Sequence, residues 1–153
     1  MKRAMVWLLA AGMILLAGCG GAPAKNADLN AVKDAIAQKY DMSEMMELST
    51  DDLLDVYGIN AEDIKQYVAL VAKTGTSADE ILLFEGTDAD AAARIREKVE
   101  ARYQAKLNEA KDYLPDEYTK TAACKVETSG NYVSMIVSAD AEDMTRIYQD
   151  AIK

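Results

Sequence analysis

Histidine is absent from this 153-residue chain, and cysteine and tryptophan occur only twice and once. Without an imidazole, the chain cannot build a histidine-dependent catalytic triad, an imidazole general base or nearly any catalytic zinc site. Any catalysis would have to use carboxylate, lysine, tyrosine or serine side chains. The acidic runs near Asp88 and Asp140 also lack the glycine and the closing glutamate of an EF-hand loop, and helix capping accounts for them. We expect no metal ion and no cofactor.

Basic side chains are in the minority, because 17 lysines and arginines face 26 aspartates and glutamates, which gives a net charge of −9. Such an acidic chain repels nucleic acid, anionic lipid headgroups and anionic wall polymers, whereas it attracts cationic proteins and peptides. Solubility alone is sufficient to account for the acidic excess. We expect no nucleic-acid partner.

The sequence has one long apolar run, residues 4–17, and it is too short to cross a membrane. A spanning helix needs about 20 apolar residues, whereas the core of a signal peptide needs about 7 to 15. The run follows two basic residues and ends in "LAGC", which resembles the lipobox of bacterial lipoproteins. We expect cleavage between Gly18 and Cys19 and a diacylglyceryl anchor on the Cys19 thiol. The alternative is an ordinary secretory signal followed by an incidental thiol.

These predictions divide the chain into three parts: a signal peptide over 1–18, a lipidated cysteine with a flexible tether over 19–27, and a single α+β domain over 28–153. The tether has small or polar side chains and extends to at most about 27 Å, so the domain should stay close to the outer face of the cell membrane. Loss of the two basic signal residues makes the net charge −11. Cys124 is then the one unmodified thiol, which excludes an intramolecular disulfide, and we expect it to be a small buried residue on a strand.

Hydrophobic periodicity predicts N-terminal helices followed by two strand–strand–helix units. The predicted helices cover 28–40, 49–56, 87–114 and a C-terminal segment capped by Asp140; the predicted strands cover 67–72, 81–84, 119–127 and 132–138. The methionine-rich segment 42–48 is compatible with a strand or with an irregular segment that fills a gap in the core. We expect a mainly antiparallel four-stranded sheet with helices packed on a face.

The two units also resemble each other in sequence. A shift of 52 residues places Lys73 on Lys125 and Asp88 on Asp140, so that the loop, the cap and the first helical turn coincide. An ancient duplication would explain this, and so would convergent turn and cap chemistry.

Short motifs along nearly the whole mature chain resemble a known family. They are "MMEL", "VYGI", "TSADEILLF", "YLPDEY" and "SGNYVSMIVS", and they follow the lipobox in this order. Together they resemble an uncharacterised bacterial lipoprotein family, domain of unknown function 4358. The resemblance implies a secreted, lipid-anchored domain in bacteria whose envelope has a single membrane, and it implies no reaction, ligand or partner.

Five residues are candidates for contact with a ligand or a partner: Tyr57, Asp79, Glu80, Tyr118 and Tyr132. Tyrosines with one apolar face commonly line the edge of a core, which is the structural explanation for three of them. Glu80 immediately precedes a four-residue apolar strand, where its carboxylate could cap a neighbouring backbone or hold a ligand.

The leading functional hypothesis is a non-enzymatic module, anchored at the cell envelope, that binds another envelope protein, a peptide or a small ligand. A carboxylate-based hydrolase is an alternative and would use Asp79 and Glu80 as acid and base. Adjacent strand residues point to opposite faces, which argues against that collaboration. A purely structural envelope protein is the other alternative.

Overall fold

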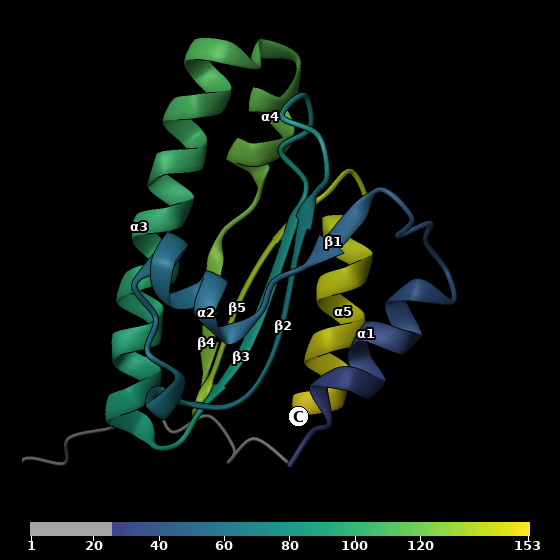
Figure 1. The fold of residues 1–153 in the computed structure, drawn as a ribbon. Coiled ribbons are helices and arrows are strands. Elements are labelled where there is room, and N and C mark those ends of the chain that lie inside the picture. The colour runs from purple at the N-terminus through teal and green to yellow at the C-terminus, as the bar shows by residue number, and fades with distance from the viewer. Residues whose placement is uncertain (1–25) are drawn as a thin grey trace, which may run out of the picture.

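A computed structural model describes residues 26–153 of the chain. The predicted signal peptide, Gly18, Cys19 and most of the predicted tether lie outside the described residues. The domain is a single antiparallel sheet covered by helices on both faces (Figure 1). The α+β class is therefore confirmed, and so is the antiparallel sheet.

The sheet contains five strands in the order β1-β2-β3-β5-β4. The strands are β1 (Met45–Glu47), β2 (Ile64–Ala72), β3 (Glu80–Gly86), β4 (Val126–Ser129) and β5 (Tyr132–Val137). The helices are α1 (Leu29–Ala37), α2 (Thr50–Asp52), α3 (Ala89–Tyr113), α4 (Pro115–Ala123) and α5 (Ala141–Ile152). A π-helical turn, η1 (Leu53–Tyr57), continues α2, and a 3-10 turn, η2 (Ala61–Asp63), precedes β2.

The sheet divides the core into two layers. The central strand β3 contributes to both, because its successive side chains point to opposite faces. Leu82 and Phe84 pack with the apolar face of α3. Ile81 and Leu83 pack with α1 and α5 on the other face. Figure 1 shows this arrangement, with α3 on one side of the sheet and α1 and α5 on the other. The predicted packing of helices on the sheet is therefore confirmed, and the helices cover both of its faces.

The sheet has five strands rather than the predicted four, because the ambiguous methionine-rich segment forms β1. Met45, Met46 and Glu47 pair with the end of β2 and make β1 an edge strand. Two of its three residues are exposed, so the strand carries no apolar alternation that the sequence alone could reveal.

The strand predicted over residues 119–127 is also wrong, since most of it belongs to α4. Pro115 ends α3 and also occupies the first position of α4, where a missing N–H costs nothing. Asp116 and Glu117 follow in the first turn, where the helix dipole favours carboxylates. Cys124 caps the end of this helix rather than lying on a strand, and its thiol donates to the carbonyl oxygen of Lys120 at 3.2 Å.

The two units whose sequences resemble each other at a shift of 52 residues are not related by a rotation within the sheet. Cross-strand partners in an antiparallel pair point to the same face. Leu82 pairs with Met135, so Ser134, which the shift equates with Leu82, points to the opposite face. The helices that follow the two hairpins, α3 and α5, likewise cover opposite faces of the sheet. Asp140 occupies the predicted cap position of α5, although its side chain makes no capping hydrogen bond.

The start of the domain is fixed at the end of the sheet where β3 finishes. The Ala27 amide donates to the Tyr132 hydroxyl at 3.0 Å, and Gln66 Nε2 donates to the Ala27 carbonyl at 2.6 Å. Gln66 and Lys65 also donate to the buried carboxylate of Glu85, at 2.5 and 2.7 Å. The chain therefore enters the fold at the Glu85 end of β3, and Glu80 lies at the other end.

Candidate functional site

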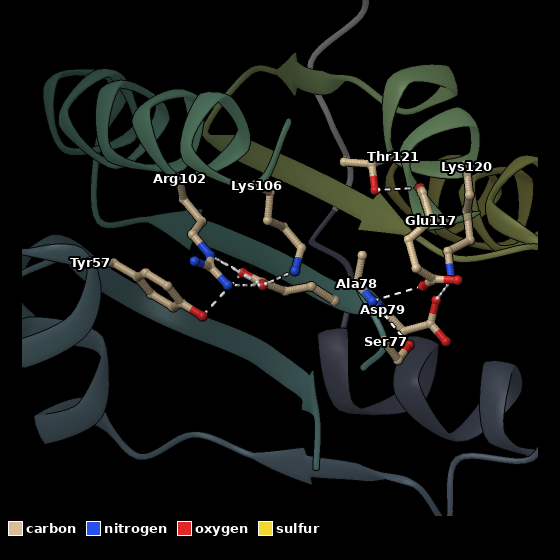
Figure 2. A network of polar contacts seen from close by, with 10 residues as sticks. Tyr57, Ser77, Ala78, Asp79, Arg102, Lys106, Glu117, Lys120 and Thr121 are labelled. Carbon is tan, nitrogen blue, oxygen red and sulfur yellow. Dashed lines mark hydrogen bonds and ion pairs between the residues drawn. The ribbon is translucent and has the colours of Figure 1, made fainter. Parts of the chain in front are cut away.

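A cavity of about 300 Å³ lies beside Glu80, where the start of β3 meets η1 and the C-terminal half of α3. Its polar lining includes Tyr57, Arg102 and Lys106, which converge on this point in Figure 2. Its apolar lining includes Val56 and Leu114. The cavity thus combines buried charge with an apolar wall, which is the usual composition of a ligand site.

The carboxylate of Glu80 is fully buried and accepts from three side chains. Arg102 forms a two-pronged contact, from Nε to Oε1 at 3.0 Å and from Nη2 to Oε2 at 2.6 Å. Lys106 Nζ forms an ion pair with Oε2 at 2.9 Å. The Tyr57 hydroxyl donates to Oε1 at 3.0 Å. These contacts occupy the roughly four acceptor sites that a carboxylate offers.

Local structure explains why these four residues meet. Arg102 and Lys106 are four residues apart on α3, so they lie on one helix face. Glu80 begins β3 and shares its α3-facing side with the even-numbered residues of that strand. Tyr57 ends η1, and Gly58, with φ of 67°, closes the turn in a left-handed conformation that favours glycine. The Arg102 guanidinium lies over the Tyr57 ring, 5.4 Å from its centroid.

Electrostatics keep this cluster charged. Burial raises the pKa of Glu80, but the Arg102 hydrogen bond and the Lys106 charge outweigh it and hold the pKa below its usual value of 4.5. Burial and the negative charge of Glu80 raise the pKa of Tyr57, which keeps its hydroxyl protonated as a donor. Glu80 is therefore a carboxylate at neutral pH.

A second polar cluster, built by α4, lies next to the first and holds Asp79 (Figure 2). Lys120 Nζ donates to Asp79 Oδ1 at 2.7 Å and forms an ion pair with Glu117. Glu117 in turn accepts from the Ala78 amide at 2.8 Å. This cluster fixes α4 to the loop between β2 and β3. Asp79 and Glu80 both line the cavity, yet each carboxylate is bound by its own cations.

The structure brings together three of the five candidate residues. Tyr57 and Glu80 share a hydrogen bond, and Asp79 lies at the edge of the same cavity. Tyr118 lies on α4, 40% exposed, and does not line the cavity. Tyr132 lies at the opposite end of the sheet, where it binds the start of the domain.

Arg102 and Lys106 are the two functional residues that sequence reasoning did not identify. A signal was present, because the buried stripe of α3 runs through positions 95, 99, 103, 106 and 110, and one of these is a lysine. A lysine in an apolar stripe requires a buried partner. Glu80 is that partner, but the pairing joins segments far apart in sequence.

A larger hollow of about 810 Å³ lies between α4, β5 and α5. Several of its charged lining residues form pairs with one another, Lys125 with Glu127 and Arg146 with Glu142. Within residues 26–153, no group of three or more aspartate, glutamate, cysteine or histidine side chains is arranged to hold a metal ion. Over the same residues, none of the helices combines the length and apolar composition required to cross a bilayer.

Comparisons with curated proteins and with solved structures each found no match. A family model does match the chain over residues 38–138, which include β1, β2, β3, α3, the whole Glu80 cluster and both strands of the second hairpin. Since the match covers most of the sequence, the chain belongs to the family described as Domain of unknown function (DUF4358).

Proposed function

We propose that this protein is a bacterial lipoprotein, anchored by Cys19 to the outer face of the cell membrane, and that its domain is a non-enzymatic binding module. Its ligand would be another envelope protein, a peptide or a small molecule, and the Glu80 cavity would be the binding site. The lipobox sequence before Cys19 supports the anchor. The main support for a binding role is that the cavity and Ala27, where the chain enters the domain, lie at opposite ends of the sheet.

The tether would reach the domain at Ala27, which is bound to Tyr132 and Gln66 at the Glu85 end of β3. Glu80 lies five residues before Glu85 in β3, which corresponds to about 17 Å along the strand. A lipid anchor attached at the Ala27 end leaves the cavity at the far end of the sheet accessible to soluble or wall-bound ligands. This geometry supports binding on the side of the domain that faces away from the membrane.

The surroundings of Glu80 favour binding over hydrolysis. A glycosidase-type acid needs a carboxyl group whose pKa is raised, so that it holds a proton at neutral pH. The pKa of Glu80 is lowered instead, and its oxygens already accept from Arg102, Lys106 and Tyr57. Asp79 is held by Lys120. A binding role uses these cations as they stand, without a proton transfer.

The anchoring proposal is tested by detergent phase partitioning of the wild-type protein, Cys19→Ser and Cys124→Ser. We expect wild type and Cys124→Ser in the detergent phase, and mature Cys19→Ser without acyl mass in the aqueous phase. Cys124→Ser is the matched control, because it removes the other thiol of the chain. If Cys19→Ser partitions like the wild type, a lipid at position 19 does not anchor the protein.

The binding role is tested by crosslinking in intact cells followed by mass spectrometry. We expect a reproducibly enriched neighbour or ligand whose recovery falls when Lys106 is replaced by methionine. A crosslinking pattern with no enriched species would favour the purely structural alternative.

A further inference from the structure

We propose that the cavity beside Glu80 binds a small monocarboxylate with an apolar body, whose carboxylate contacts Lys106 and Arg102 and whose apolar part contacts Val56 and Leu114. This inference rests on the proposed binding function and names the chemical class of the ligand. Its basis is the set of charges in direct contact with Glu80, where two cations share one buried carboxylate.

An excess of positive charge follows from the count of charges around Glu80. One carboxylate faces two cations, and its acceptor sites are filled by Arg102, Lys106 and Tyr57. The Lys106 side chain is only 6% exposed, and within the described residues Glu80 is its one ion-pair partner. An ammonium has three N–H donors and a guanidinium has five, so both cations retain donors for a further acceptor.

Within the described residues, the other charged side chains that line the cavity make no ion pair with Lys106 or Arg102. Asp79 shares Lys120 with Glu117, and Lys73 donates to the Ser43 carbonyl at 2.5 Å. Glu109 is exposed at the mouth of the cavity; its charge helps to raise the pKa of Arg102, but within the described residues it forms no ion pair with either cation. Among the side chains in direct contact with Glu80, two cations therefore meet one carboxylate, which leaves one positive charge in a chain whose net charge is −9.

The size and the walls of the cavity define the ligand further. A volume of about 300 Å³ corresponds to about ten water molecules, which suits a ligand of amino-acid size. Val56 is 62% exposed although it borders the cavity, so an apolar group placed there would gain burial. A single carboxylate offsets one positive charge, whereas a phosphate dianion would add repulsion from Glu80 and would leave the apolar wall unused.

The experiment uses the full chain in a nonionic detergent and isothermal titration with three probes: N-acetyl-L-leucine, N-acetyl-L-leucinamide and inorganic phosphate. The first two have nearly the same shape and differ in the carboxylate. We expect the acid to bind with a Kd of about 1 mM or lower and at least about tenfold more tightly than the amide or phosphate. Equal affinities for acid and amide, tighter binding of phosphate, or no binding of the acid up to about 10 mM would each overturn the proposal.

Variants then locate the binding site. Lys106→Met keeps the length of the side chain and removes its charge, and we expect it to weaken binding of the acid at least about tenfold. Lys111→Met makes the same charge change at an exposed position of α3 outside the cavity and should leave the Kd unchanged. Lys106→Arg retains a cation and should bind within about threefold of the wild type. Equal affinities of Lys106→Met and Lys111→Met would place the ligand elsewhere and overturn the proposal.

The comparison of acid with amide on the wild-type protein needs no variant, so it remains decisive even if Lys106→Met fails to fold. It is also independent of the anchor. A failure of lipid anchoring appears as altered partitioning of Cys19→Ser and leaves the affinity for N-acetyl-L-leucine unchanged. A wrong ligand class appears in the titration and leaves the partitioning unchanged.

Discussion

Replacing Glu80 by glutamine should destabilise the domain strongly, because it removes the one negative charge that the buried Lys106 and the partly buried Arg102 share. The glutamine side chain preserves the shape and one acceptor oxygen, so the change is mainly electrostatic. Removing one partner of a buried ion pair costs about 3–5 kcal/mol. Lys106 is 6% exposed, whereas Arg102 is 25% exposed and partly solvated. We therefore expect a loss toward the lower end, about 3–4 kcal/mol.

Urea unfolding of the full chain in nonionic detergent, followed by far-UV circular dichroism, measures this loss. Glu85→Gln is the matched control, because Glu85 is also a buried glutamate of β3. Its cation, Lys65, is 51% exposed and can return to water when the carboxylate is lost. Glu85→Gln should therefore lose less than half as much stability as Glu80→Gln.

A double variant tests the cause of the loss. If Glu80→Gln is destabilising because it leaves cations unpaired, then adding Lys106→Met removes one of them and should restore part of the stability. Glu80→Gln/Lys106→Met should thus be more stable than Glu80→Gln alone. A double variant that is less stable than the single one, or equal losses for Glu80→Gln and Glu85→Gln, would refute the electrostatic explanation.

Three further predictions concern the rest of the fold. Gly86→Ala should lose about 1–3 kcal/mol in the same unfolding assay, because its added Cβ would lie 2.6 Å from a backbone nitrogen of α3, whereas Gly75→Ala meets nothing within 4 Å and should be nearly neutral. Tyr40→Phe should raise the pKa of Asp143 from about 2 toward 3.8 in an NMR titration, because the Tyr40 hydroxyl is the largest cause of the depression. The stability that Asp143 contributes is present above pH 3.8 and is lost as the pH falls toward 2, so the variant should lose less stability than the wild type over this pH range. Tyr132→Phe should cost about 1 kcal/mol and speed hydrogen exchange of the amide that donates to its hydroxyl where the chain enters the domain.

The elements that could be predicted from the sequence are those whose local pattern and tertiary environment agree. The apolar run 81–84 becomes the core of the central strand, and the three-four spacing of 89–113 becomes the long helix, because each buries the face that its period defines. The edge strand 45–47 has little buried surface and therefore no periodic signal. Proline is favoured both just after the end of a helix and at the first position of a helix. The local pattern at Pro115 therefore cannot show whether the chain only leaves one helix or also begins a second one.

The candidate site was predictable only in part, for a similar reason. Glu80 was conspicuous because a carboxylate precedes an apolar strand, and Tyr57 was one of three tyrosines selected as candidate contact residues. Arg102 and Lys106 have ordinary neighbours in a highly charged helix, and only their position on the buried face gives them a role. The sheet determines which face of α3 is buried. Arg102 is 22 residues away from Glu80 in the sequence, so no local pattern reveals that the two residues pair.

The two buried glutamates of β3 show why one end of the strand is proposed as a binding site and the other is not. They are five residues apart, an odd number, so they point to opposite faces. Glu85 faces one exposed lysine, a neutral glutamine and the tyrosine that binds the chain entry, so its charges balance and its contacts serve the fold. Glu80 faces two cations, one of them almost fully buried beside an open cavity. Two cations that share one buried carboxylate are costly to keep, and a ligand that supplies a second negative charge would give a physical reason for keeping them.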